Sequence, residues 1–319
     1  MVDAAHNLTP VTLELGGKDP AIVLADTKIK EFVSVFMRAV YQSAGQNCIG
    51  IERFIVHDSL VDQLVSAVVP RIQELRLGSW LQDTRKGRLQ TSGEDQGEDR
   101  VDCGAMITDA HFDHLESIIA DAVQRGAKLH IGGRRHHHRQ WPAGHYFAPT
   151  MLSGVTEAMA IAQQECFAPI FLLMPFEDVE DAIRIANGTK MGLGSSVFGN
   201  NPEQVRYVQQ RMQAGMCNLN DFAVNYLNQS LPFGGIKRSG FGRFAGPEGL
   251  RGLCYTHVVI EDRFFFWIRT SIPAPLEYPL KSSASSFAFI AGLHHLAFGT
   301  TWKVRVRGLW DVMREAIRR

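Results

Sequence analysis

The chain has 319 residues, 45% of them hydrophobic, and its 33 Lys and Arg residues balance 33 Asp and Glu residues. This length predicts about two domains, and the charge balance argues against a nucleic acid partner and favours a small neutral substrate. The five cysteines are odd in number, widely spaced and without a CxxC pair, which argues against a disulfide framework or a zinc site.

The N-terminal region predicts a strand soon after the start of the chain. Residues 1–10 lack the features of a secretory signal, so we expect a cytoplasmic protein. Residues 11–17 predict a buried strand that points Leu13 and Leu15 to one face and Glu14 to the other. Two glycines follow Glu14, and a buried carboxylate at such a turn has a raised pKa and can act as a general base. The alternative is an ordinary carboxylate at a strand end.

Cys48 follows a probable helix that begins near Lys30. A lone cysteine is most often a small buried hydrophobe. Here Gly45, Gln46 and Asn47 form a polar approach that would expose backbone N–H groups near the sulfur. Such a setting lowers the pKa of a thiol and can stabilise an oxyanion, so we expect Cys48 to be the most reactive of the five thiols.

Strand and helix patterns alternate along most of the chain, which predicts an α/β fold with a parallel sheet. The expected strands lie at 21–25, 53–57, 128–132, 195–199 and 215–220, and the clearest helices at 110–125 and 177–187. Residues 86–100 are expected to form an exposed loop insertion, and residues 134–139 (RRHHHR) the tip of a second loop. Adjacent histidines in a solvated loop rarely converge, so we predict no metal site.

The tail over residues 263–319 is first apolar and then basic. Its uncharged stretch, 282–302, is long enough to cross a bilayer, yet His294, His295 and several Ser and Thr residues make it a poor spanning helix. Peripheral docking at a membrane interface and packing against protein are the two other interpretations.

Four segments resemble, in the same order, signature segments of the aldehyde dehydrogenase superfamily: LELGGKDP at 13–20, GQNC at 45–48, ECFAPI at 165–170 and PFGGIKRSGFGR at 232–243. The 34-residue spacing from Glu14 to Cys48 resembles that of the family, and the match extends from about Leu8 to about Ile260. Residues 69–78 and the long tail also resemble a fungal, membrane-linked branch named for meiotic sister-chromatid recombination.

The resemblance implies three parts: residues 1–16 as the last strand of a cofactor-binding domain, 17–262 as the catalytic domain and 263–319 as an extension. The N-terminal Rossmann-type domain of the family is then largely missing. Its residues include the asparagine of the oxyanion hole and the glycine-rich turn at the pyrophosphate. We therefore expect the chain alone to bind NAD weakly and to be inactive.

The resemblance also implies a mechanism in which Cys48 attacks an aldehyde, hydride passes to NAD or NADP, and water activated by Glu14 hydrolyses the thioester. Glu165 matches the residue that holds the nicotinamide ribose, and Phe167 matches the aromatic residue beside it. Ala168 departs from the usual glycine. The predicted function is NAD(P)-dependent oxidation of an aldehyde to a carboxylic acid, in a protein that is a homo-oligomer when full length.

Two alternatives remain. The chain could be a non-catalytic remnant with an assembly or membrane-associated role, or it could hydrolyse activated esters at Cys48 and Glu14 without a cofactor.

Overall fold

The computed structural model describes residues 1–79, 101–264, 266–267 and 271–317. Contacts divide the chain into two compact units, Met1–Tyr255 and Thr256–Arg319. The division lies a few residues before the extension expected from residue 263. The predicted loop insertion at 86–100 lies outside the described residues.

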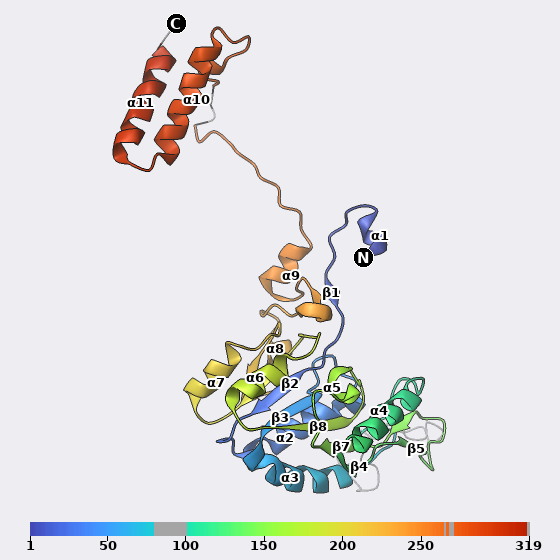
Figure 1. The fold of residues 1–319 in the computed structure, drawn as a ribbon. Helices are drawn as coiled ribbons and strands as arrows, with labels where there is room; N and C mark the ends of the chain where they lie inside the picture. Colours follow the sequence, from blue (N-terminus) through green and yellow to red (C-terminus); the bar gives the residue numbers. More distant parts are fainter. Residues whose placement is uncertain (80–100, 265, 268–270, 318–319) are drawn as a thin grey trace. The chain divides into compact units, whose positions relative to one another are not determined.

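A seven-stranded sheet forms the centre of the first unit, in the order β10-β9-β2-β3-β8-β7-β4 (Figure 1). Every neighbouring pair is parallel except β4 with β7. The predicted α/β fold with a mostly parallel sheet is therefore confirmed. The strands are β2 (Pro20–Val23), β3 (Arg53–His57), β4 (Lys128–Ile131), β7 (Thr150–Ser153), β8 (Ile170–Phe176), β9 (Ser196–Phe198) and β10 (Asn218–Leu219).

Helices cover both faces of this sheet, so its central strands are apolar on both sides rather than alternating in polarity. Alternate residues of β2 show the division. Ala21 and Val23 pack with α2 (Ile29–Tyr41) and α3 (Val61–Gln73). Ile22 faces the other side, where a second core includes residues of α4 (Phe112–Gln124), α5 (Ala160–Gln163), α6 (Val179–Asn187) and α7 (Pro202–Gln209).

The segments that precede β2, β3, β8 and β9 meet at one edge of the sheet, because parallel strands place their amino ends together. Lys18 and Asp19 precede β2, Glu52 precedes β3, and residues 165–169 precede β8. Segments far apart in the sequence thus become neighbours at this edge.

The N-terminal segment differs from its prediction. Only Leu13–Glu14 forms a strand, β1, and it pairs antiparallel with β11 (Gly240–Phe241) instead of lying in a parallel sheet. Glu14 and Leu15 are exposed, so the expectation of a buried strand over 11–17 is wrong. Among the described residues, strand β1 pairs only with the two-residue strand β11, and the few apolar residues around Glu14 do not suffice to bury β1.

Smaller elements complete the first unit. The histidine-rich segment enters a two-stranded hairpin, in which β5 (Arg135–His136) pairs with β6 (Tyr146–Phe147). In the part of the chain that is described, no three His, Cys, Asp or Glu residues lie together as a metal-binding group. The other short helices are α1 (Val2–Ala5), α8 (Val224–Leu227) and α9 (Gly246–Gly252).

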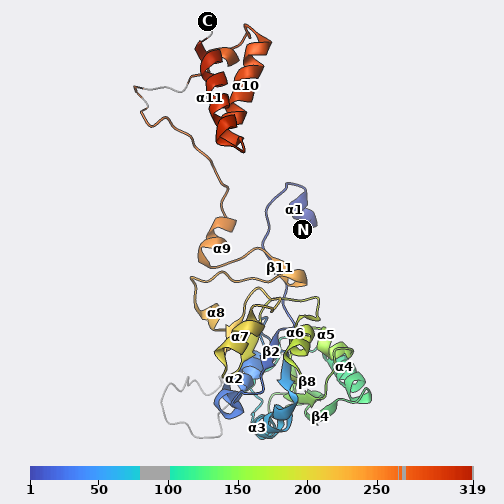
Figure 2. The same cartoon turned by 60° about the vertical axis from the view of Figure 1, so that its left-hand side comes forward.

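The second unit is a helical hairpin of α10 (Ser283–Phe298) and α11 (Trp302–Ile317), which lie side by side in both ribbon views (Figures 1 and 2). Two glycines allow the close approach: a Cβ added to Gly308 would lie 2.6 Å from the carbonyl oxygen of Gly292. Among the described residues, no helix is long and apolar enough to span a membrane.

Candidate active site

The loop that carries Cys48 begins where α2 ends at Tyr41. Ser43, Ala44 and Gly45 adopt left-handed backbone conformations, with φ of 56°, 55° and 73°. A Cβ at Gly45 would lie 2.1 Å from the carbonyl oxygen of Ala168, so only glycine fits there. The loop that carries Cys48 is therefore packed directly against the segment that contains Glu165 and Phe167.

Cys48 is half-buried at the wall of an open pocket with an empty volume of about 990 Å³. Asn47 fixes the loop, because its Oδ1 accepts a hydrogen bond of 3.2 Å from the backbone N–H of Ile49. The pocket is lined by both polar and apolar side chains. Its lining includes Val35, Arg38, Gln46, Phe222, Tyr226 and Leu227.

Burial first, and then the carboxylates of Glu14 and Asp19, raise the pKa of the Cys48 thiol to about 11, while the Ile49 N–H opposes them. The predicted lowering of this pKa is therefore wrong. The sequence showed the glycine and the polar neighbours of the thiol, but not two carboxylates brought beside it by the fold. At neutral pH the Cys48 thiol is therefore mostly protonated, with the Glu14 carboxylate nearby.

Glu14 and Cys48 are thus close enough to interact, although they are 34 residues apart in the sequence. Strand β1 holds Glu14 opposite Gly240, and the Leu15 N–H donates to the Ser239 carbonyl at 3.0 Å. The glutamate is exposed and not in the buried cleft that we expected. A solvent-facing carboxylate beside a thiol can accept a proton from the thiol or from water.

Glu165 lies against the two glycines that follow Glu14. Its Oε1 accepts a hydrogen bond of 3.2 Å from the Gly17 N–H, and a Cβ at Gly16 would lie 2.5 Å from Oε2. Burial is the main reason that the pKa of Glu165 is raised, to about 7. Phe167 is 39% exposed beside it, as a contact surface for a ligand would be.

A buried ion pair that the sequence analysis missed supports this segment. Glu52 accepts hydrogen bonds of 2.9 Å from the backbone N–H groups of Cys166 and Phe167, and Lys18 Nζ lies 2.5 Å from Glu52 Oε2. Phe167 has φ of 48°, a conformation that a non-glycine residue adopts only when its surroundings hold it. The pair therefore fixes the backbone on which Glu165 and Phe167 sit.

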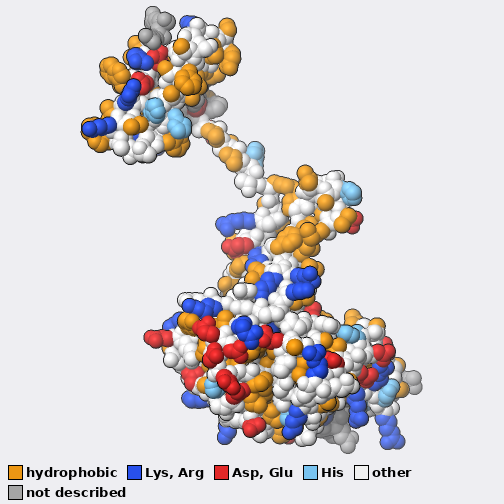
Figure 3. All heavy atoms as spheres, viewed as in Figure 1, with side chains coloured by type: hydrophobic (Ala, Val, Ile, Leu, Met, Phe, Trp, Pro, Cys, Tyr) orange, Lys and Arg blue, Asp and Glu red, His pale blue; other side chains and the backbone are white. Residues whose placement is uncertain are grey.

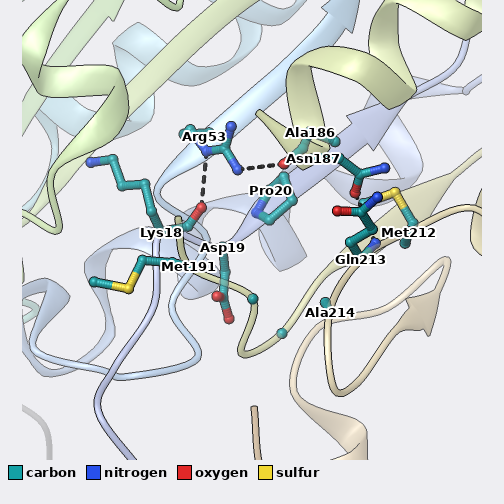
Figure 4. A pocket seen from close by; sticks show the side chains of 12 residues that line it. Lys18, Asp19, Pro20, Arg53, Ala186, Asn187, Met191, Met212, Gln213 and Ala214 are labelled. Atoms are coloured by element: carbon teal, nitrogen blue, oxygen red, sulfur yellow. Dashed lines mark hydrogen bonds between the residues drawn. The ribbon is translucent and has the colours of Figure 1, made fainter. Parts of the chain in front are cut away.

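Arg53 and Asp19 line a small pocket together with Lys18 (Figure 4). Arg53 is buried and donates to the carbonyl oxygens of Lys18, Ile185 and Ala186 at 2.8–2.9 Å. The Asp19 side chain points away from that of Lys18. Burial raises the pKa of Asp19 well above its usual range. The signal available in the sequence was a charged residue next to an apolar strand: Lys18 before β2 and Arg53 at the start of β3.

The raised pKa of Cys48 makes a testable prediction about alkylation, because only the thiolate reacts. The rate of iodoacetamide labelling at Cys48 should rise about tenfold per pH unit from neutrality towards pH 11. Glu14→Gln removes a neighbouring negative charge and should accelerate labelling at pH 8. Peptide mass spectrometry measures both rates.

Exposed Cys254 provides the internal reference, and we now expect it, not Cys48, to be labelled first at pH 7. A Cys48 rate that reaches its plateau below pH 9, or that falls in Glu14→Gln, would contradict this electrostatic description.

Comparisons with known proteins identify the family of this chain. The aldehyde dehydrogenase family profile matches residues 1–259. An aldehyde dehydrogenase-like protein of Schizosaccharomyces pombe is 45% identical over 98% of this chain, which covers 56% of that protein. A similarly described protein of Saccharomyces cerevisiae is 43% identical over 98% of this chain and is covered over 47% of its length.

Solved structures show the same similarity. An NAD-dependent aldehyde dehydrogenase from Sinorhizobium meliloti matches 78% of this chain with 34% identity and a TM-score of 0.68, over 45% of that structure. A betaine aldehyde dehydrogenase from Staphylococcus aureus, in complex with NAD⁺, matches 79% with 31% identity and a TM-score of 0.69, over 46% of its length. The chain spans about half the length of the curated relatives it matches. With the family profile over most of its length, the chain belongs to the aldehyde dehydrogenase family.

Proposed function

We propose that the protein oxidises an aldehyde to a carboxylic acid through a covalent intermediate on Cys48. One observation carries the proposal: Cys48 lies at the wall of an open, partly apolar pocket and within the electrostatic influence of Glu14. A nucleophile with an adjacent proton acceptor is the arrangement that covalent catalysis requires. Membership of the family supports this class of reaction.

In the proposed sequence, the Cys48 thiol loses its proton to solvent and the thiolate attacks the aldehyde carbon to form a thiohemiacetal. The pKa of Cys48 is about 11, so little thiolate exists at neutral pH and the thiolate fraction limits this step. After oxidation to the thioester, Glu14 removes a proton from water, which attacks the acyl carbon and releases the acid. Its exposed position gives water direct access to the carboxylate.

The residues at the sheet edge fit a nicotinamide cofactor, NAD or NADP. The Glu165 carboxylate is held against the Gly16–Gly17 backbone, where a larger side chain would collide with it. A carboxylate accepts two hydrogen bonds and so suits the vicinal hydroxyls of a ribose. When bound, the cofactor supplies the hydride acceptor. Glu165 and Phe167 would orient its nicotinamide end.

Hydrolysis of activated esters is a second candidate activity, because Cys48 and Glu14 suffice for acylation and deacylation without hydride transfer. A strict requirement for NAD or NADP separates the two. Acid formation from an aldehyde that depends on the cofactor supports the proposal, whereas cofactor-independent ester cleavage alone supports the second activity.

Glu14→Gln, made in a chain extended to the full length of its relatives, provides the sharpest test of the mechanism. Loss of a general base typically lowers a rate about 10²–10⁴-fold, so steady-state turnover should fall by this amount. Glu31→Gln, an exposed glutamate on α2, is the matched control and should behave as wild type. Stopped-flow detection of reduced cofactor measures the first turnover separately from the steady state.

A burst of reduced cofactor that persists in Glu14→Gln would place the glutamate in thioester hydrolysis. Loss of burst and turnover together would place its essential role in thiol deprotonation. Unchanged turnover would remove Glu14 from the mechanism.

A further inference from the structure

An apolar stripe runs along α11 on the side away from α10. We define this outer stripe by six residues: Trp302, Val306, Leu309, Trp310, Met313 and Ile317. They recur at three, four and seven residues and therefore share one side of the helix. Trp302 is 71% exposed, Trp310 64% and Ile317 79%.

The opposite side of α11 accounts for the contact within the hairpin. Gly308 lies against Gly292 of α10, and Glu315 is only 1% exposed. The Ser285 hydroxyl of α10 donates to Glu315 Oε2 at 2.7 Å. The hairpin is therefore closed by its inner side, and the outer stripe is not needed to hold it together.

Basic side chains border the outer stripe. Lys303 and Arg307 each follow a stripe residue by one position, which places both on the same side of the stripe. Both are exposed, and the acidic residue nearest to them on the helix, Asp311, is only partly exposed and lies 3.8 Å from Arg314. Figure 3 shows this unit with large apolar side chains and Lys and Arg side chains among them on one face.

Helix α10 adds a second exposed apolar surface. Phe287 is 76% and Phe298 72% exposed, and the helix contains no Asp, Glu, Lys or Arg. Each helix has 16 residues and so is about 24 Å long, shorter than the ~30 Å hydrocarbon core of a bilayer. The hairpin has the surface of a membrane-contacting element without the length to span.

We propose that α11 docks the protein on the surface of an anionic phospholipid bilayer. The outer stripe enters the interface between headgroups and acyl chains, with Trp302 and Trp310 at headgroup depth, and Lys303 and Arg307 contact the lipid phosphates. An apolar face rich in Trp, Leu and Ile beside a Lys and Arg border is the pattern of interfacial helices. A protein partner would match the apolar stripe but would gain nothing from the cationic border unless it were itself acidic. This inference is independent of the proposed function.

Flotation of the 319-residue chain with lipid vesicles tests the proposal. Binding should be stronger to phosphatidylcholine vesicles containing phosphatidylserine than to phosphatidylcholine alone. Each basic residue near an anionic surface contributes about fivefold in affinity, so Lys303→Gln/Arg307→Gln should lower binding to the anionic vesicles by about 30-fold. Lys28→Gln/Arg125→Gln removes two exposed charges from the first unit and should leave binding unchanged.

Trp302→Ser/Trp310→Ser should abolish binding to both kinds of vesicle, while the helical circular dichroism persists because both side chains are exposed. Tryptophan emission should shift to shorter wavelength on adding anionic vesicles to the wild type. Equal binding to the two kinds of vesicle would overturn the proposal. So would a wild-type oligomer that dissociates in the Trp302→Ser/Trp310→Ser variant without any vesicle binding, since the stripe would then be a protein interface.

Discussion

In a chain extended to the full length of its relatives, replacing Cys48 with serine should abolish aldehyde oxidation and any ester hydrolysis. A serine hydroxyl is a weaker nucleophile and a much weaker acid than a thiol, and Glu14 alone cannot generate its alkoxide. Removal of a covalent nucleophile costs on the order of 10⁶-fold in turnover. The measurement is steady-state formation of acid and of reduced cofactor, together with mass detection of the acyl-enzyme after rapid acid quench.

Cys254→Ser is the matched control, because this thiol is exposed and lies outside all four motifs. It should retain wild-type turnover and the acyl-enzyme adduct. An adduct on another cysteine, or turnover within tenfold of wild type in Cys48→Ser, would refute the nucleophile assignment. Loss of function in both variants would indicate a general structural defect instead.

Glu52→Gln should destabilise the first unit by about 3–5 kcal/mol, because it leaves the Lys18 ammonium buried without a charged partner. Glutamine keeps an oxygen that can accept one of the two N–H groups of Cys166 and Phe167, so the loss is mainly electrostatic. The free energy of unfolding, measured in urea, gives the magnitude. Binding of the nicotinamide end should weaken as well, since the backbone of Glu165 loses its support.

The double variant Lys18→Met/Glu52→Gln serves as the control. It removes the buried charge, so it should be more stable than Glu52→Gln alone. A pH series adds a second check. Burial lowers the pKa of Lys18, but Cys166 and Glu52 raise it more, and the pKa is raised overall from 10.5. The stabilisation should be present below that pH and be lost as the pH rises through the folded pKa. A double variant less stable than the single one would show that Lys18 acts through packing.

The strands of the sheet could be predicted from the sequence because each is an apolar run that can be recognised without knowing its neighbours in the fold. Runs such as 21–25 and 54–56 are continuously apolar, and glycines or caps end the intervening helices. The segment at 11–17 has the same apolar character, but its strand needs a partner, and the partner is Gly240–Phe241, more than 220 residues later. No pattern within the segment indicates that pairing or its antiparallel direction.

The candidate site was predictable in its identities but not in its electrostatics. Motif order indicated Cys48, Glu14, Glu165 and Phe167. The sign of the pKa shift at Cys48 depends on burial and on which carboxylates the fold brings near it, and both arise from tertiary contacts. The pairing of Lys18 with Glu52 is similarly non-local. It follows from the parallel register of β2 and β3, which brings the residues before the two strands together.

The contact between Gly45 and Ala168 has a mechanical consequence. No side chain from Gly45 separates these two backbones, so there is no soft layer to absorb a displacement. A shift of a few tenths of an ångström in the segment of Glu165 must move the loop of Cys48 by a similar amount. In the proposed mechanism, a ligand that binds against Phe167 would therefore also change the position of the Cys48 sulfur relative to the substrate. Cofactor binding and nucleophilic attack would then be coupled through this one backbone contact.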